Sequence, residues 1–359
     1  MNNPAKRQRR YSEFVREGLF VAMPLRFPSV STGIADDNAF VAHLAEGPGG
    51  GRSMLGICHG AEQHLFAAVL TAPTGYVVDL GCIDEADELT TVGWRETDLH
   101  IPHLFAGGRI DDDGALWAGK GYFFADGIQE WGLNRPLFGR VQTFPGEPVR
   151  DAVALEDGVL CLTDWAVYLL DAEMGEVKAR QPFQCVRCMR GARLMPCGDR
   201  RVLLDDAGRV HEILASQSAE LQIVPHDVQL PAMDLPTIVT THRGEHELIV
   251  GDGQGMIVTA NLDARTVCEH DPAPLAPVHC LAALPDGRIY GFCGDEIGRL
   301  FRTCALSCET TDLDVVATVY GARRYAYCMA CALTNPDGHI VFGEYDRGGH
   351  LWIYCPPLG

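Results

Sequence analysis

Short runs of alternating apolar and polar residues, separated by turns rich in Asp and Gly, recur along the whole chain. The clearest copies are residues 285–302 and 335–354. Each has an Asp-Gly turn, a β-rich run that ends near Gly, a polar loop and a second β-rich run. Alternation with a period of two predicts strands, so each copy predicts two neighbouring strands of a sheet. Only residues 11–17 could form a turn or two of helix.

Weaker copies of the same pattern run through the rest of the sequence. They are residues 52–69, 112–131, 156–171, 206–214 with the strand before it, and 245–262. One apolar residue of the third predicted strand marks each repeat: Leu65, Ile128, Val167, Val210, Ile257, Leu300 and Leu351. These markers are about 40 to 60 residues apart, the length that four short strands and their turns need. The pattern therefore predicts an all-β, seven-bladed β-propeller with four-stranded antiparallel blades.

The two ends of the chain are expected to meet in one blade. The last repeat runs out after its third strand, so its blade lacks an outer strand. The β-rich run 19–27 precedes the first full repeat and could supply that strand, which would remove an open sheet edge. Pro24 fits such an edge position. We therefore expect a tail at residues 1–18 and one propeller domain at residues 19–359.

Composition narrows the classes of partner. Of the 359 residues 47% are hydrophobic, enough for a large core, and the formal net charge is −19. This charge opposes binding to nucleic acid or to an anionic membrane, so a small molecule, an oligosaccharide or a protein is the expected partner. No apolar run has the length of a signal peptide or of a spanning helix, which predicts a cytoplasmic protein with reduced thiols.

Ionisable and aromatic residues are expected to gather at one end of the propeller. Inner-strand starts and the loops between second and third strands share that end because strand direction alternates. The candidate ligand-binding or catalytic residues there are His59, His103, Lys120, Tyr122, Arg150, Asp164, Trp165, His279, Asp295, Glu296, Tyr345, Asp346 and Arg347. Such groups on loops are typical of a ligand or catalytic site.

Three segments carry a resemblance to a known kind of protein: residues 54–66, 286–291 and 346–352. They resemble blade repeats of bacterial propellers related to polysaccharide lyases and streptogramin lyase. The resemblance implies β-elimination, in which a base removes the proton α to a carboxyl group and a cation stabilises the enolate. It would make His279 or His59 the base, Tyr345 the acid, and Arg150 or Arg347 the carboxylate clamp. The substrate would be a small acidic or carbohydrate-like molecule.

A non-catalytic propeller that serves as a protein-interaction scaffold or as a subunit of an assembly is the alternative hypothesis. In that case each histidine would donate a structural hydrogen bond to a backbone carbonyl. Asp295, Glu296 and Asp346 would cap turns by accepting hydrogen bonds from loop amides. The same residues thus fit either hypothesis.

A metal or redox protein is a third hypothesis, because the chain has 14 cysteines. Two C-x-x-C pairs, Cys185 with Cys188 and Cys328 with Cys331, have a spacing that can bind zinc. Both pairs fall in or beside predicted inner strands, where residues three apart point to opposite faces. Small cysteines also suit the crowded axis of a propeller, so we expect structural cysteines and no metal or other cofactor. A divalent metal held by His59, His103 and His279 is the remaining metal hypothesis.

Overall fold

The computed structural model describes strands at intervals between Leu19 and Cys355. The described residues are 19–24, 27–28, 35–36, 40–46, 53–59, 63–71, 74–82, 100–110, 116–126, 130–133, 139–142, 149–155, 158–163, 165–171, 177–183, 193–197, 200–205, 207–215, 220–234, 239–295, 297–318, 324–325, 329–334, 338–344 and 350–357. Side chains are described in most of these ranges from residue 160 onward. Within them, no helix is long and apolar enough to cross a membrane.

Antiparallel four-stranded sheets account for most of the described strands, which confirms the all-β prediction. In five of these sheets the strands pair in chain order. The first two consist of β4 (Phe40–Glu46), β5 (Ser53–His59), β6 (Gln63–Thr71) and β7 (Thr74–Cys82), and of β12 (Val149–Leu155), β13 (Gly158–Thr163), β14 (Ala166–Asp171) and β15 (Val177–Pro182). The next two consist of β16 (Arg193–Cys197), β17 (Arg200–Leu204), β18 (Arg209–Ala215) and β19 (Leu221–Gln229), and of β20 (Val239–Arg243), β21 (Glu247–Gly251), β22 (Ile257–Asn261) and β23 (Thr266–Glu269). The fifth consists of β24 (Val278–Ala283), β25 (Arg288–Cys293), β26 (Arg299–Cys304) and β27 (Thr310–Val315).

The remaining sheets depart from this simple order. β9 (Leu116–Asp126) pairs with β8 (His100–Ile110), β10 (Glu130–Leu133) and β11 (Gly139–Gln142). β30 (Met329–Thr334), β31 (Ile340–Glu344) and β32 (His350–Cys355) form a sheet with β1 (Leu19–Pro24) at its edge. Two short pairs complete the set: β2 (Phe27–Pro28) with β3 (Ala35–Asp36), and β28 (Ala317–Thr318) with β29 (Arg324–Tyr325).

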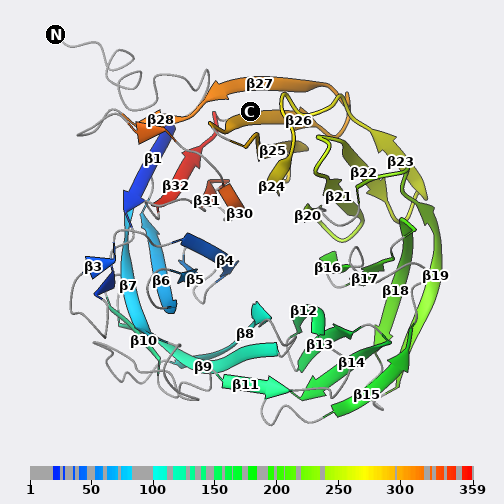
Figure 1. The fold of residues 1–359 in the computed structure, drawn as a ribbon, viewed down its shortest axis with the longest axis horizontal. Coiled ribbons are helices and arrows are strands. Elements are labelled where there is room, and N and C mark those ends of the chain that lie inside the picture. Colours follow the sequence, from blue (N-terminus) through cyan, green and yellow to red (C-terminus); the bar gives the residue numbers. More distant parts are fainter. Residues whose placement is uncertain are drawn as a thin grey trace.

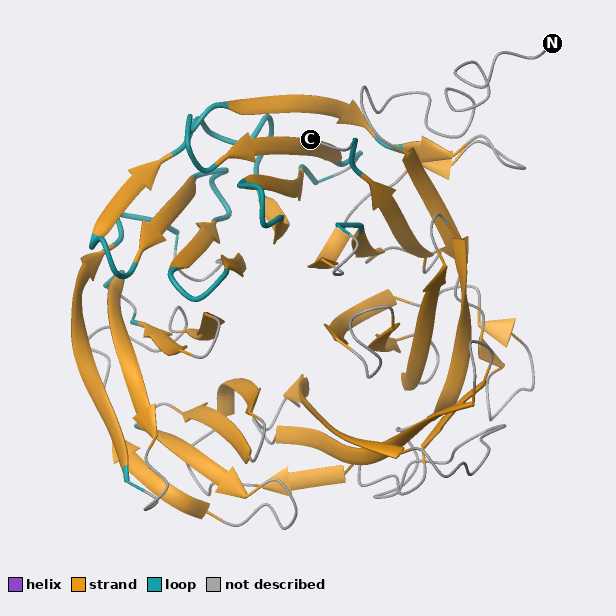
Figure 2. Ribbon diagram, turned by 180° about the vertical axis from the view of Figure 1, so that it is seen from behind, coloured by secondary structure: helices purple, strands orange, loops and turns teal. Residues whose placement is uncertain are grey.

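The sheets stand around a common axis, which is the arrangement of a β-propeller (Figure 1). The first strand of each chain-order sheet lies nearest the axis, and strands such as β15, β19 and β27 lie at the periphery. Seen from the other side, the described loops and turns, drawn in teal, lie mainly around the β20–β23 and β24–β27 sheets (Figure 2). Each sheet therefore packs face to face against the next sheet around the axis.

The repeat markers predicted from the sequence lie where expected in most of the described sheets. Val167, Val210, Ile257, Leu300 and Leu351 all lie on third strands and are buried. Leu65 lies on β6, also a third strand. Ile128 and the segment 11–17 lie outside the described residues. The spacing of apolar residues along the sequence thus predicted the third strands of these sheets.

Alternation along the strands fills two different cores. On β25, Tyr290 and Phe292 enter a core shared with β31 and β32, where they meet Phe342 and Tyr354. Ile289, on the opposite face of β25, enters the core shared with the β20–β23 sheet. Each sheet of this type buries both faces, as sheets packed between two neighbours must.

The cysteines give one confirmed expectation and one correction. Cys197, Cys280 and Cys293 are buried, as expected of small residues in crowded strands, and burial raises the pKa of Cys197 and of Cys293 to about 11. The prediction that the thiols are reduced is wrong for one pair, because Cys268 and Cys308 form a disulfide. Sequence reasoning missed this pair because its members are 40 residues apart and share no motif.

The two C-x-x-C pairs remain untested. Cys185, Cys188 and Cys328 lie outside the described residues, and for Cys331 only the strand position on β30 is described.

We predict that Gly291→Ala lowers the free energy of unfolding by about 1–3 kcal/mol, the usual cost of overpacking a core. A methyl group at Gly291 would overlap the buried Phe301 ring and lie 2.9 Å from Leu281 Cδ2. Urea unfolding measures the change. Phe301→Leu removes the overlapping ring atoms, so it should cost less in the Gly291→Ala background than in the wild type. Equal costs in both backgrounds would contradict the packing argument.

Candidate functional site

One face of the propeller carries two kinds of loop, and we call it the loop face. It holds the loops between second and third strands and the connections that run from an outer strand to the next inner strand. Backbone hydrogen bonds join the two kinds: Phe183 N to Trp165 O (3.0 Å), Leu230 N to Gly208 O (2.9 Å) and Ala273 N to Gly255 O (2.8 Å). This repeated bond holds each connection against a loop, so the face has a defined backbone frame.

Buried aspartates cap two successive loops in the same way. Asp205 Oδ1 accepts hydrogen bonds from Ala207 N and Arg209 N, each at 2.9 Å. Asp252 Oδ1 accepts from Gln254 N and Met256 N, also at 2.9 Å. In each loop a glycine with positive φ follows three residues later, at Gly208 and Gly255. The D-x-x-G sequence therefore encodes a capped turn at the end of the second strand.

Asp252 also joins neighbouring segments of the chain. Its Oδ2 accepts a hydrogen bond from Asp234 N (2.9 Å), in the connection before β20. Its backbone carbonyl accepts from Val278 N (3.0 Å), at the start of β24 in the next sheet. Asp252 thus ties one loop to the segments on both sides of it.

Asp205 binds a buried histidine in addition to its own loop. His211 Nε2 lies 3.0 Å from Asp205 Oδ2, and Arg209 Nε donates to the same oxygen at 2.8 Å. Burial acts to raise the pKa of Asp205, but the bonds from His211, from the loop amides and from Arg209 outweigh it and lower the pKa. Asp205 is therefore an ionised structural group, and the ring of Phe183 packs edge-on against His211 at 5.1 Å between ring centroids.

Thr163 has the corresponding place at the end of β13. Its hydroxyl donates to Ala166 O (3.1 Å) and accepts from Ala166 N (3.1 Å) and Trp165 N (3.3 Å). Sequence reasoning missed Thr163, Asp205 and Asp252 as a group. The signal that could have found the aspartates is the spacing of D-x-x-G before the third-strand markers.

His279, Trp165 and Asp295 are the predicted site residues whose side chains are described. His279 Nε2 lies 2.8 Å from Gly294 O. A carbonyl can only accept, so Nε2 carries the proton and donates. This is the structural hydrogen bond that the scaffold hypothesis expects of such a histidine. Asp295 follows Gly294 directly and is exposed. Trp165 lies on a loop of the β12–β15 sheet, and two further sheets stand between it and the sheet of His279.

Five further predicted residues have strand positions only. His103 and Arg150 lie near the starts of the inner strands β8 and β12, as expected. His59 ends β5. Lys120 and Tyr122 lie within β9, which corrects the expectation that they belong to a loop, because β9 continues through them.

Asp164, Glu296, Tyr345, Asp346 and Arg347 lie outside the described residues. The site roles of all thirteen candidates therefore stay predictions.

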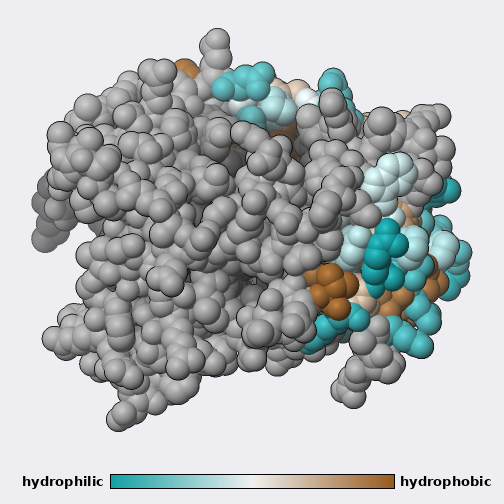
Figure 3. Space-filling model, turned by 60° about the horizontal axis from the view of Figure 1, so that its bottom comes forward, coloured by the Kyte–Doolittle hydropathy of each residue, from teal (hydrophilic) through white to brown (hydrophobic). Residues whose placement is uncertain are grey.

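Large apolar side chains are exposed on the described part of the loop face. Trp165 is 48% exposed, Leu275 43% and Ile297 41%. Leu275 and Ile297 belong to adjoining segments, since a Cβ at Gly294, in the loop of Ile297, would lie 2.8 Å from Leu275 Cδ1. Figure 3 shows apolar surface beside polar residues on one side of the molecule. Exposed apolar groups on a fixed frame are typical of a binding surface.

A cation beside the loop of Ile297 is already paired with carboxylates. Arg299 begins β26, and its guanidinium bonds Asp312 (2.6 and 3.1 Å) and Asp314 (3.1 Å) on β27. The bond to Asp312 raises the pKa of Arg299 above its ordinary value. Arg299 is thus engaged by two aspartates of its own sheet, whereas Asp295 is exposed.

Asp252→Ala is expected to lower the free energy of unfolding by about 2–4 kcal/mol, because three backbone N–H groups lose their acceptor. Asp295→Ala is the matched control: it belongs to the next D-x-x-G sequence but is exposed, so its cost should stay within about 0.5 kcal/mol. Chemical denaturation of both variants measures the difference. Similar costs for the two would show that the buried cap does not stabilise the loop.

Comparison with known proteins adds little to this geometry. No protein-family model matches the chain, and no curated protein matches it. Among solved structures, the chain is similar to the WD40 beta propeller domain of Doa1, with a TM-score of 0.48 and 10% sequence identity, over 88% of this chain and 97% of that chain. The assignment as a β-propeller therefore rests on the sheets and their arrangement around one axis.

Proposed function

We propose that the protein is a non-catalytic β-propeller that binds a protein partner on its loop face. The observation that carries this proposal is that polar side chains of that face are used in structural hydrogen bonds, whereas large apolar side chains are exposed. Asp205 and Asp252 cap turns at the ends of second strands, and His279 donates to a carbonyl. Three large apolar side chains of the face remain exposed: Trp165, Leu275 and Ile297. Apolar and aromatic side chains on a rigid frame are the usual anchors of protein interfaces.

The chemistry of the face and of the chain defines the partner. The formal net charge of −19 and the exposed Asp295 favour a partner with basic residues around its apolar anchors. Opposite charges would speed association, and the apolar contacts would supply most of the affinity. We expect the binding to weaken at high salt mainly through slower association.

The β-elimination hypothesis has less support among the described residues. Arg299 is paired with two aspartates, and His279 Nε2 donates its proton to a backbone carbonyl, so this nitrogen cannot act as the base. The predicted acid Tyr345 and clamp Arg347 lie outside the described residues. A lyase activity therefore enters the test below as the competing outcome.

We further propose that the sheets form seven blades and that β1 closes the ring as the outer strand of the last one. Support comes from the antiparallel pairing of β1 with β32, which runs from Leu19 opposite Cys355 to Pro24 opposite His350. Such pairing would leave β32 without a free edge.

A photo-crosslinking amino acid placed at Ile297 should form a discrete adduct with a partner protein in the cells that make this chain. Leu275→Glu should weaken that partner's binding at least about tenfold, as expected when an interface anchor is lost. Leu306, 86% exposed in the turn between β26 and β27 on the opposite face, is the control position for both the crosslinker and the substitution to Glu. Equal adducts from the two positions, or none from either, would contradict the loop-face proposal.

The competing activity is measured on the same preparations. Purified protein incubated with uronate-containing oligosaccharides should release no unsaturated product. If it does release such a product, and His279→Ala abolishes this without lowering the melting temperature, the elimination hypothesis replaces the scaffold.

Deleting residues 1–24 should lower the free energy of unfolding by about 3 kcal/mol or more. The deletion removes a six-residue strand, and each lost hydrogen bond costs about 0.5–1.5 kcal/mol. Deleting residues 1–17 keeps β1 and is the matched control, with little expected change. If the two deletion variants have the same free energy of unfolding, the proposal that β1 closes the ring is wrong.

A further inference from the structure

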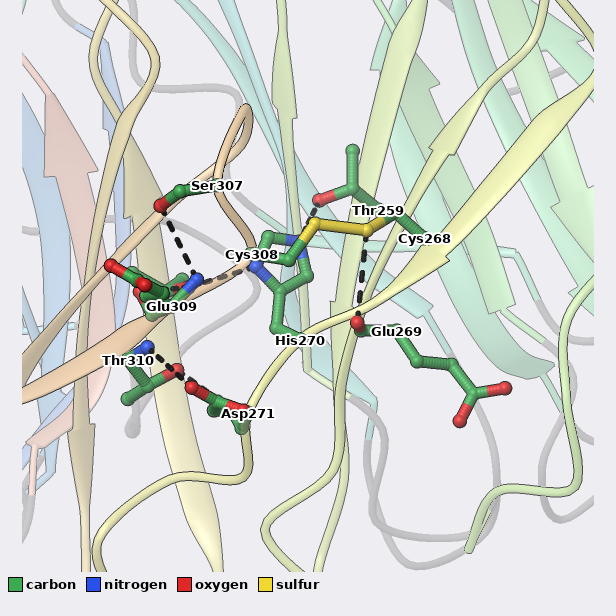
Figure 4. The surroundings of a disulfide bond; sticks show 10 residues. Thr259, Cys268, Glu269, His270, Asp271, Ser307, Cys308, Glu309 and Thr310 are labelled. Carbon is green, nitrogen blue, oxygen red and sulfur yellow. Dashed lines mark hydrogen bonds between the residues drawn. A yellow bond between two sulfur atoms is a disulfide. The ribbon is translucent and has the colours of Figure 1, made fainter.

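Three side chains with metal-binding chemistry meet where the β20–β23 sheet adjoins the β24–β27 sheet. One ligand atom from each of Cys268, His270 and Cys308 lies within 4.8 Å of the other two. Cys268 lies on β23, His270 comes directly after that strand, and Cys308 lies in the turn between β26 and β27. In this structure the two sulfur atoms form a disulfide beside the imidazole ring (Figure 4).

Backbone hydrogen bonds hold these residues together independently of the disulfide. Asp271 N donates to Cys308 O (2.9 Å), and the Thr310 hydroxyl donates to Asp271 O (2.6 Å). His270 N donates to Ile257 O at 2.9 Å, which extends the pairing of β23 with β22. The two thiols should therefore stay adjacent when the sulfur–sulfur bond is reduced.

Hydrogen bonds to the buried His270 ring assign its tautomer. The Thr303 hydroxyl donates its proton to Glu309 O (3.1 Å), so it accepts from His270 Nδ1–H, 2.8 Å away. His270 Nε2 then carries the lone pair and accepts from the Thr259 hydroxyl at 2.7 Å. Figure 4 shows this edge of the ring close to the two sulfur atoms.

An imidazole that has its lone pair on one nitrogen and a fixed N–H on the other is the usual form of a histidine ligand, and the hydrogen bonds of His270 give it this form.

We propose that the reduced protein binds one Zn²⁺ ion through the sulfur atoms of Cys268 and Cys308 and Nε2 of His270. Two thiolates and one imidazole are ligands that Zn²⁺ prefers, and a water molecule would complete the tetrahedron. Cys268 and Cys308 are only half-buried, so water can reach the fourth position. Thr303 would hold Nδ1–H and orient the ring, as outer partners of zinc-bound histidines do.

Reduction and binding balance as two separate steps. Two molecules of a thiol reductant transfer two electrons and two protons to the disulfide, giving two protein thiols and one reductant disulfide. Zn²⁺ then displaces one proton from each thiol, and Nε2 exchanges its hydrogen bond with Thr259 for a bond to the metal. Disulfide and zinc are thus mutually exclusive, and each would link the same two sheets.

Cobalt titration of the full-length chain tests the proposal, because Co²⁺ reports its ligands through its spectrum. The reduced wild type should bind one equivalent of Co²⁺ with thiolate-to-metal charge-transfer and tetrahedral d–d bands, and Zn²⁺ should displace it. Cys268→Ser and Cys308→Ser should each weaken this equivalent more than about 100-fold, beyond the 10–100-fold effect of losing an outer partner. Thr303→Val should weaken Co²⁺ binding by only about 10–100-fold, because it removes an outer partner of His270.

The matched control is Cys304→Ser, which changes a partly buried free thiol at the end of β26, beside the same turn. It should retain the full equivalent of Co²⁺, and the oxidised wild type should lose it. Each cysteine variant is first checked for an unchanged melting temperature. The proposal is overturned if the reduced chain binds no Co²⁺, or if the bound equivalent survives in Cys268→Ser and Cys308→Ser, since other cysteines would then hold it.

Discussion

The packing of each sheet between two neighbours is the constraint on which the rest of this structure depends. A strand such as β25 sends Tyr290 and Phe292 to one side and Ile289 to the other, so both sides of its sheet are apolar. Neither side can face water without losing the burial that stabilises the fold. Arranging the sheets around an axis gives each of these faces a partner. The close approach of Phe301 to Gly291 shows how tightly one such sheet is filled.

This packing leaves the polar ends of the strands to be satisfied locally. Thr163, Asp205 and Asp252 lie at the ends of second strands and bind the amides of the loops that follow. The loops are therefore fixed at their bases, while their tips can carry exposed side chains at little cost to stability. Trp165, in the loop capped by Thr163, uses that freedom. A frame of this kind suits recognition of another protein, in which a few apolar anchors supply most of the affinity.

A second polar system lies away from the loop face and joins two sheets. His270 bridges the hydroxyl of Thr259 on β22 and that of Thr303 on β26, and the disulfide lies beside it. The apolar contacts between neighbouring sheets tolerate small shifts. Directed hydrogen bonds and a covalent link fix the position of one sheet relative to the next. The same geometry makes this junction sensitive to the redox state of its surroundings.

The sequence by itself determined the repeating strands, because a period of two and Asp-Gly turns are local properties of the chain. It predicted the third-strand positions of Val210, Ile257 and Leu300. It also predicted a β-rich run at residues 19–27, of which Leu19–Pro24 pairs with β32. Only the tertiary structure decided which aspartate of the D-x-x-G sequences is buried. Cys293 pairs with Arg299, so Gly294 takes the place that Asp252 has after Gly251, and Asp295 falls one residue later and is exposed. It also decided that Cys268 meets Cys308, since contact between residues 40 apart depends on how two sheets pack and leaves no trace in the local pattern.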